Sequence, residues 1–213
     1  RRGIVISNCV IQASYAANDG GGVYFPSTAT GLVTGTTFTR NRGTYGGGLC
    51  ARGAGLVVSN CVFRENGADG GPGTGGAGAF LAASGTVVLC TFERNVSTGN
   101  DGGGLLINAG TPTVDRCQFV DNTADDWGGG LASYGGTAVI QNSLFLGNRA
   151  DEGGAVHFNG GGVLRNNTLV DNRANLLSSS GGGIYLGGGA VENCILYFNS
   201  PENYAVPAAL RFT

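Results

Sequence analysis

The 213-residue sequence contains no lysine and no methionine, and all twelve of its basic residues are arginine. Charged residues make up only 12% of the chain and the formal net charge is −2. The sequence therefore lacks the basic surface that binds nucleic acids or anionic membranes. No stretch approaches the roughly 18 apolar residues of a membrane-spanning helix, and we expect no signal peptide within these residues. We therefore expect no nucleic-acid partner and no membrane insertion by this segment. Because the chain opens on Arg1 rather than on methionine, we expect it to be a processed product or a piece of a longer protein.

Glycine is the residue in excess, with 42 of the 213 positions against an average usage of about 7%. Glycine-rich chains are often disordered or collagen-like. Here, however, the glycines follow no three-residue period, and 41% of the residues are apolar. The chain is therefore expected to bury a core.

Two short phrases recur in step along almost the whole chain. The first is F-x-x-N, whose copies start 24 to 29 residues apart and lie at Phe38–Asn41, Phe63–Asn66, Phe92–Asn95, Phe119–Asn122 and Phe145–Asn148, with variants at Ile11–Ser14, Leu169–Asn172 and Leu196–Asn199. The second is a glycine phrase that begins at Gly20, Gly46, Gly75, Gly102, Gly128, Gly153 and Gly181. Such a period indicates a stacked repeat architecture.

Within each repeat the side chains alternate as they do in short strands. Cys61 and Phe63 lie two residues apart and face one side, whereas Val58 lies three residues before Cys61 and indicates a bend between them. No segment keeps a helical period. We predict an all-β fold, a right-handed parallel β-helix of about eight rungs of ~26 residues with three short strands per rung. Residues 1–200 form the repeats, and 201–213 form a C-terminal capping or linker segment.

The repeated polar and aromatic residues are predicted to be structural. Stacked asparagines can adopt the left-handed turn conformation and pass amide hydrogen bonds from rung to rung. The predicted structural columns are Asn41, Asn66, Asn95, Asn122, Asn148, Asn172 and Asn199; Phe38, Phe63, Phe92, Phe119 and Phe145; and Cys61, Cys90 and Cys117.

These phrases resemble the GGA[ILV] and FxxN motifs of the passenger repeats of chlamydial polymorphic membrane proteins. More broadly, the chain is similar to right-handed parallel β-helix repeat proteins of bacterial cell surfaces. The segment "GGAV" (Gly153–Val156) matches the first motif fully, most other copies read GGG, and FxxN matches in five copies. The resemblance implies secretion and an adhesive or structural role, and it does not imply an enzyme.

Cysteine and histidine give no sign of a reactive site. Cys9 and Cys194 share the inward position of Cys61, which favours buried thiols over disulfides. Cys50 is predicted to face outward as a surface thiol. His157, the only histidine, lies between Val156 and Phe158 and is predicted to face solvent. No C-x-x-C motif and no second histidine are present, so neither a zinc site nor a catalytic triad is expected.

Acidic residues gather between the two phrases, and three interpretations stay open for them. The loops contain Asp19, Asp69, Asp101, Asp125, Asp126, Asp151 and Glu152. These carboxylates can be solvated surface groups, weak calcium ligands (Asp101, Asp125, Asp126 and Asp151) or an acid/base pair. With Trp127, which we expect to pack against the coil, Asp125, Asp126 and Asp151 are the candidates for ligand binding. No other cofactor is expected.

The leading hypothesis is a non-enzymatic, secreted β-helix segment of a bacterial cell-surface or extracellular fibre protein, acting as an adhesin or a structural scaffold. The alternative is a carbohydrate-active enzyme (a polysaccharide lyase or glycoside hydrolase) or a glycan-binding module that uses the acidic loop edge. One outward column is rich in aliphatic residues and threonine, which favours lateral packing against another chain, such as a like chain, or covering by a neighbouring segment. It consists of Val10, Thr37, Val62, Thr91, Gln118, Leu144, Thr168 and Ile195. Cell-surface glycans are the other expected partners.

Overall fold

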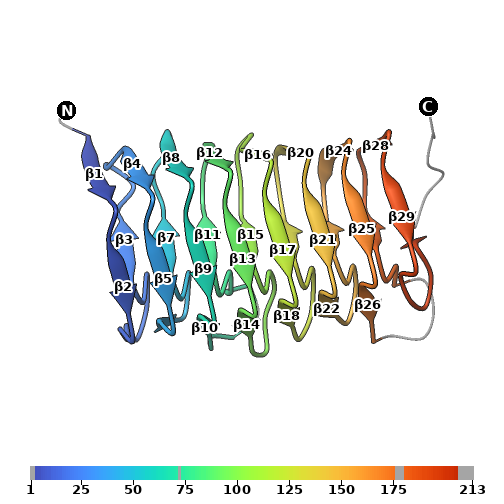
Figure 1. Cartoon of the computed structure of the whole chain (residues 1–213), viewed down its shortest axis with the longest axis horizontal. Helices are drawn as coiled ribbons and strands as arrows, with labels where there is room; N and C mark the ends of the chain where they lie inside the picture. The colour runs from blue at the N-terminus through green and yellow to red at the C-terminus, as the bar shows by residue number, and fades with distance from the viewer. Residues whose placement is uncertain (1–2, 72, 176–179, 206–213) are drawn as a thin grey trace.

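A computed structural model describes residues 3–71, 73–175 and 180–205 of the chain. The described residues wind into a rod of about seven turns, and equivalent strands of neighbouring turns pair in parallel (Figure 1). This arrangement is the parallel β-helix that the repeats predict, and the number of turns is close to the eight expected.

Three sheets of eight strands, here named A, B and D, run along the rod, and a short sheet C of six strands lies between B and D. Sheet A contains β1 (Ile4–Ser7), β4 (Gly31–Thr34), β8 (Leu56–Ser59), β12 (Gly85–Val88), β16 (Thr113–Asp115), β20 (Thr137–Gln141), β24 (Gly161–Arg165) and β28 (Ala190–Glu192). Sheet B contains β2 (Val10–Gln12), β5 (Thr37–Thr39), β9 (Val62–Arg64), β13 (Thr91–Glu93), β17 (Gln118–Val120), β21 (Leu144–Leu146), β25 (Thr168–Val170) and β29 (Ile195–Tyr197).

The remaining two sheets complete each turn. Sheet C contains β6 (Arg42–Gly43), β10 (Gly67–Ala68), β14 (Val96–Ser97), β18 (Thr123–Ala124), β22 (Arg149–Ala150) and β26 (Arg173–Ala174). Sheet D contains β3 (Val23–Phe25), β7 (Leu49–Ala51), β11 (Ala79–Leu81), β15 (Leu105–Ile107), β19 (Leu131–Ser133), β23 (Val156–Phe158), β27 (Ile184–Leu186) and β30 (Tyr204–Ala205). Most turns therefore have a fourth, two-residue strand besides the three predicted.

The predicted phenylalanine column is confirmed. Phe38, Phe63, Phe92, Phe119 and Phe145 are fully buried, and their rings stack almost parallel with centroids 4.6 to 4.8 Å apart. The spacing equals the distance between neighbouring strands. Equivalent residues of successive turns therefore lie directly over one another.

The asparagines form the predicted hydrogen-bond ladder inside the coil. In the middle of the ladder, the backbone N–H and the side-chain Nδ2 of Asn95 both donate to Oδ1 of Asn122, at 3.1 and 2.9 Å. The same Nδ2 also donates to the backbone carbonyl of Phe63 at 2.9 Å. At the C-terminal end, Asn203 takes the place of a further rung, because the N–H and Nδ2 of Asn199 both donate to its Oδ1.

The left-handed conformation, however, belongs to a different residue than predicted. In the F-x-x-N phrase the residue before the asparagine has positive φ, as in Glu65 at 54° and Arg94 at 50°. The asparagine itself keeps an ordinary φ, because its backbone N–H must point along the ladder. The bend predicted after Val58 is confirmed by Asn60, with φ 51°. Each turn thus has one left-handed corner before sheet B and another after it.

One glycine triplet shows why the second phrase is glycine-rich. Gly102 has φ +61°, a conformation that other residues rarely adopt. A Cβ on Gly103 would lie 2.4 Å from the carbonyl oxygen of Gly129, and one on Gly104 would lie 2.6 Å from that of Gly130. The backbones of successive turns therefore approach too closely at this corner for any side chain.

Cysteine occupies the inward column as predicted in the middle of the rod. Cys61, Cys90 and Cys117 are about 1% exposed, and all six cysteines are free thiols. Cys9 is exposed and Cys194 is half-buried, because each lies in an end turn with a neighbour on one side alone. Residues 206–213 lie outside the described residues, and the capping role expected for 201–213 stays a prediction.

Candidate functional site

Side chains on the outer face of sheet D form a second hydrophobic cluster, separate from the core. Its buried members are Cys50, Phe80, Leu106 and Ala132, and the partly buried members are Tyr45, Ala82, Trp127 and Tyr134. We call this group the outer cluster. It covers the middle of sheet D.

Cys50 is buried, which corrects the prediction of a surface thiol. Its side chain points outward from the coil, but the Arg52 guanidinium lies over the rings of Tyr45 and Phe80 and closes this end of the outer cluster. Arg52 is held there by an ion pair with Asp19 at 2.6 Å. Burial raises the pKa of the Cys50 thiol to about 12, so it is not a thiolate at neutral pH.

His157 is also buried, at 2% exposure, although it was predicted to face solvent. Its ring is stacked between Trp127 and Tyr185, with centroids 4.6 Å away on both sides. Trp127 therefore packs against the coil as expected. Burial lowers the pKa of His157 to about 3, so the imidazole is neutral at pH 7 and its 3.4 Å contact with Glu152 is not a charged pair. Nδ1 of His157 has no hydrogen-bond partner among the described residues.

The signal for this covered face is present in the sequence. Phe80 and Leu106 occupy the outward position of sheet D in two consecutive turns, next to Cys50 and Ala132. Four small or apolar residues in an unbroken outward column indicate a surface that other side chains cover.

The acidic candidates do not converge on one point. Asp125 accepts a hydrogen bond from the backbone N–H of Gly99 at 2.6 Å, and Asp151 accepts one from Asn175 at 3.1 Å. Asp126 contributes its backbone carbonyl, which accepts from the next turn. Each of these residues thus stabilises its own loop contact. The structure does not gather them into an open pair.

Asp101 is the one candidate carboxyl with a strongly altered environment. It is 2% exposed, accepts a hydrogen bond from the backbone N–H of Trp127 at 3.0 Å, and accepts another from the Tyr134 hydroxyl. Burial raises its pKa to about 6, and the neighbouring charge of Asp126 adds to this effect. Such a pKa suits a general acid, but Trp127 and Tyr134 pack around the group and a substrate has no direct approach to it.

A family model described as a right handed beta helix region matches residues 58–206, well over half of the chain. The chain belongs to this β-helix family. The match confirms the predicted β-helix repeat and its right-handed winding, whereas the resemblance to proteins of bacterial cell surfaces stays a prediction.

One curated relative is informative about context. The β-helix chain is 31% identical over 126 residues to the metabotropic glutamate receptor-like protein R of Dictyostelium discoideum. The aligned region is 55% of this chain and 7% of the relative, so the chain spans a small part of that protein's length. No solved structure gives a significant match. The narrower resemblance to chlamydial polymorphic membrane proteins is carried by neither match and stays a prediction.

Within the described residues of the β-helix, no group of three or more His, Cys, Asp or Glu side chains is placed to hold a metal ion. The four calcium candidates, Asp101, Asp125, Asp126 and Asp151, do not form such a group, and weak calcium binding by them stays a prediction. Across the same residues, no helix has the length and apolar character that crossing a membrane requires.

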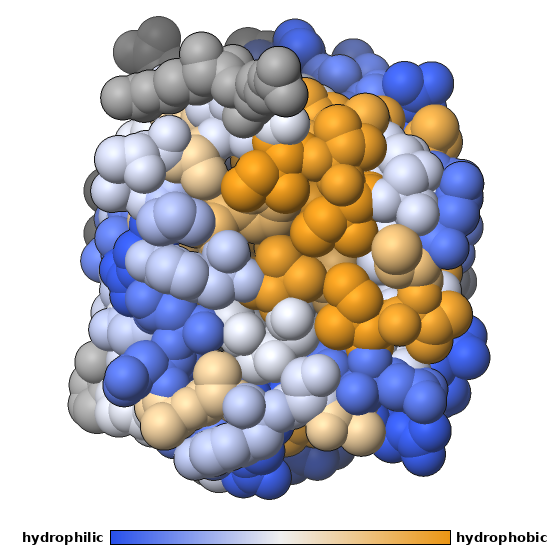
Figure 2. Space-filling model, turned by 90° about the vertical axis from the view of Figure 1, so that its left-hand side faces the viewer, coloured by the Kyte–Doolittle hydropathy of each residue, from blue (hydrophilic) through white to orange (hydrophobic). Residues whose placement is uncertain are grey.

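The N-terminal end of the rod exposes apolar side chains (Figure 2). Ile4, Val5 and Val10 are 46%, 65% and 68% exposed, and Ile6 and Ile11 are only partly covered by the core behind them. The strands of this end, β1, β2 and β3, are the outermost strands of sheets A, B and D. Among the described residues, open strand edges and apolar side chains thus coincide on one face.

The outward column of sheet B is in register as predicted, from Val10 through Leu144 to Ile195. Its members inside the rod are mostly half-buried, whereas Val10 and Ile195, at the two ends, are 68% and 63% exposed. The column is therefore a flat lateral strip that becomes strongly apolar and exposed only at the ends of the rod.

Proposed function

We propose that this chain is a non-enzymatic β-helix segment of an extracellular protein at the bacterial cell surface, where it acts as a structural scaffold or adhesin. Two comparisons support an extracellular β-helix domain: the family match, and a relative whose name describes it as receptor-like. The adhesive or structural role is inferred from the construction of the rod itself.

The observation that carries the proposal is where the recurring residues lie. The phenylalanine, asparagine and cysteine columns are buried and bonded to one another, so the repeated positions build the rod and leave nothing for chemistry. Asp125 and Asp151 are each hydrogen-bonded to a residue of a neighbouring turn, and the carboxyl with the most suitable pKa, that of Asp101, is covered. A stiff rod of stacked turns suits a spacer or a presenting surface.

The enzymatic alternative can be tested directly. We expect no turnover of polygalacturonate or of neutral β-glucans, with calcium or with a chelator, at pH 5 to 8. Turnover that disappears in Asp126→Ala or Asp101→Asn, but persists in the exposed-surface variant Asn108→Ala, would show that the acidic edge is catalytic and that the proposal is wrong.

Like chains are the proposed partners of the N-terminal end. In the segment described, the outer edges of β1, β2 and β3 are open, so a second copy of this segment can pair with them and cover Val5 and Val10 at the same time. We expect light scattering to show concentration-dependent oligomers that the double variant Val5→Asp/Val10→Asp abolishes. Thr168→Asp, in the same outward column but inside the rod, is the matched control and should leave them intact.

The same experiment distinguishes the lateral strip from the end. Oligomers that resist the double variant but dissociate in Thr168→Asp or Leu144→Asp would assign association to the strip of sheet B. A monomer at all concentrations would refute assembly of like chains and leave the cell-surface glycan as the expected partner.

A further inference from the structure

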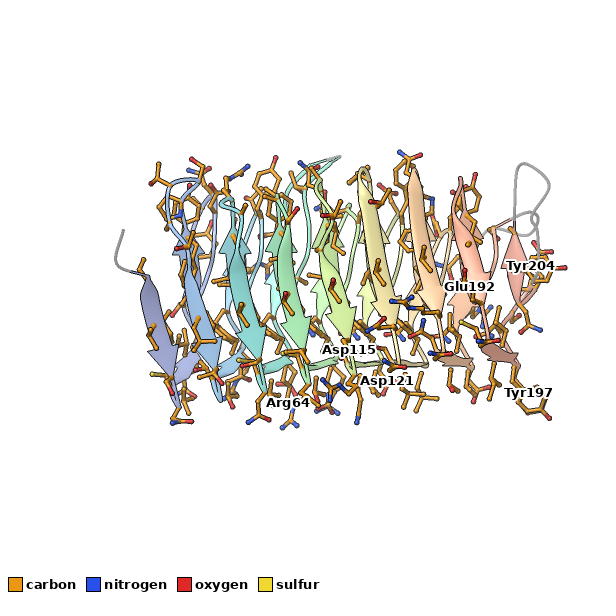
Figure 3. The ribbon with its side chains drawn as sticks, turned by 90° about the horizontal axis from the view of Figure 1, so that it is seen from above. Arg64, Asp115, Asp121, Glu192, Tyr197 and Tyr204 are labelled. Atoms are coloured by element: carbon orange, nitrogen blue, oxygen red, sulfur yellow. The ribbon has the colours of Figure 1, made fainter. Side chains whose placement is uncertain are left out.

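A hollow of about 320 Å³ lies on the edge of the rod where the chain passes from sheet B to sheet C. Three arginines line it, Arg40, Arg42 and Arg94, together with Glu65, Gly67 and Val96. Figure 3 shows the same edge, on which Arg64 and Asp121 project along the row of corners. The hollow lies on a different edge from the outer cluster.

The hollow exists because one residue of a column lacks a side chain. Gly67 pairs with Arg42 in the preceding turn and with Val96 in the following turn of sheet C. A Cβ on Gly67 would meet no atom closer than 3.6 Å, and the φ of this residue is not positive. Neither the backbone nor the packing therefore requires glycine here. The absence of a side chain at Gly67 leaves an open space between Arg42 and Val96, which forms the floor of the hollow.

The guanidinium groups around this floor are not fully neutralised. Arg42 pairs with Asp69 at 2.8 Å, and Arg94 pairs with Glu93 at 2.6 Å and more loosely with Glu65 at 3.5 Å. Arg40 makes no ion pair and no side-chain hydrogen bond with the described residues. Glu65 is the one acid in the lining, so the hollow contains more positive than negative groups.

We propose that this hollow binds the oxyanion group of an acidic ligand, a carboxylate or a sulfate, between Arg40 and Arg94 and above Gly67. A guanidinium presents two parallel N–H donors that match the two oxygens of such a group. Arg40 has its donors free for this purpose, and the missing side chain at Gly67 provides the room. The group can come from a free inorganic anion or from an acidic polysaccharide. The site stands whether or not like chains assemble.

Titration of the ¹⁵N-labelled protein tests the site, with sodium sulfate as the first probe and sodium chloride at equal ionic strength as the reference. We expect sulfate to cause saturable chemical-shift changes at the amides of Gly67 and Val96. Arg40→Gln should weaken binding by roughly tenfold, because charge-assisted hydrogen bonds are lost. Gly67→Val, which fills the floor and keeps all charges, should abolish it.

Arg173→Gln is the matched control, because it removes the same charge from an exposed arginine of sheet C several turns away. It should leave binding unchanged. A chondroitin sulfate hexasaccharide is the second probe: tighter binding than sulfate identifies the acid group of a polysaccharide, and equal or weaker binding identifies a free anion. Shifts that chloride reproduces, or that persist in both Arg40→Gln and Gly67→Val, would overturn the proposal.

Discussion

Replacing Asn95 by alanine tests whether the asparagine ladder holds the turns together. The Asn95 side chain donates to the carbonyl of Phe63 and to Oδ1 of Asn122, at 2.9 Å each. Its own Oδ1 accepts from the backbone N–H and from Nδ2 of Asn66, at 3.0 Å each. All of these groups are sealed from water, since Asn95 and Asn122 are fully buried and Asn66 is 1% exposed.

The size of the effect follows from the groups left behind. In Asn95→Ala the backbone N–H of Asn66 has no acceptor, and the carbonyl of Phe63 loses its side-chain donor. A buried polar group without its partner is destabilising by about 1–3 kcal/mol. We therefore expect the free energy of unfolding to fall by about 4 kcal/mol for the two groups together.

Equilibrium unfolding in urea, followed by circular dichroism, measures the change. Asn108→Ala, at an exposed position, should alter stability by less than about 0.5 kcal/mol. Asn199→Ala should fall between the two, because this end of the ladder is 8% exposed and water can replace the lost bonds. If Asn95→Ala unfolds within about 0.5 kcal/mol of Asn108→Ala, the ladder does not stabilise the fold and the reasoning fails.

Three further predictions concern the core, one carboxyl and the thiols. Phe92→Ala should lower the free energy of unfolding by about 3–5 kcal/mol, and Phe92→Leu by less than about 2 kcal/mol, because Leu169 fills the same column in another turn. The pKa of Asp101 is raised to about 6 in the folded protein, whereas the unfolded chain releases this proton near pH 4. The free energy of unfolding should therefore fall by on the order of 3 kcal/mol as the pH rises from about 4 to about 6. Asp101→Asn should remove this pH dependence, as measured by urea unfolding at a series of fixed pH values. An aromatic disulfide reagent should modify Cys9 rapidly in the native protein and Cys50 only after denaturation.

The columns of the coil could be predicted because each residue lies against the equivalent residue of the next turn, which is often of the same type. A parallel, in-register repeat places Phe63 on Phe92 and Asn66 on Asn95, so the period alone decides which side chains touch. No folding energy needs to be known for this step. The same logic correctly identified the bend before Cys61, where the alternation of inward residues breaks.

The left-handed corners could not be read in the same way. Their occupants include Arg40, Leu89 and Arg116, none of which favours positive φ, and an isolated left-handed residue of this kind is unfavourable by about 1–2 kcal/mol. The corner is imposed by the hydrogen-bonded turns on both sides, which determine the backbone whatever the side chain is. The asparagine next to it has the right propensity but serves the ladder instead.

The outer face of sheet D was misjudged for a related reason. Alternation along β7 and β23 correctly gives the outward direction of Cys50 and His157, but direction is not exposure. Whether an outward residue is covered depends on side chains from the loop of its own or a neighbouring turn. Arg52 and Trp127 reach over the sheet, and no periodic signal reports how far such side chains extend.

A residue that differs in size from the equivalent residues of the other turns therefore marks a place where the surface of the rod departs from the repeat. In the outward column of sheet D, Ala132 is smaller than its neighbours Leu106 and His157. The indole of Trp127 fills the space above Ala132 and stacks on the ring of His157. Gly67 interrupts sheet C between Arg42 and Val96, and there the space stays open. The first vacancy is filled by the chain itself and strengthens the scaffold, whereas the second is lined by charge and left free. In a repeat of this kind, a binding site differs from a packing adjustment in two ways. The space is lined by polar groups, and the backbone conformation does not require the small residue that creates it.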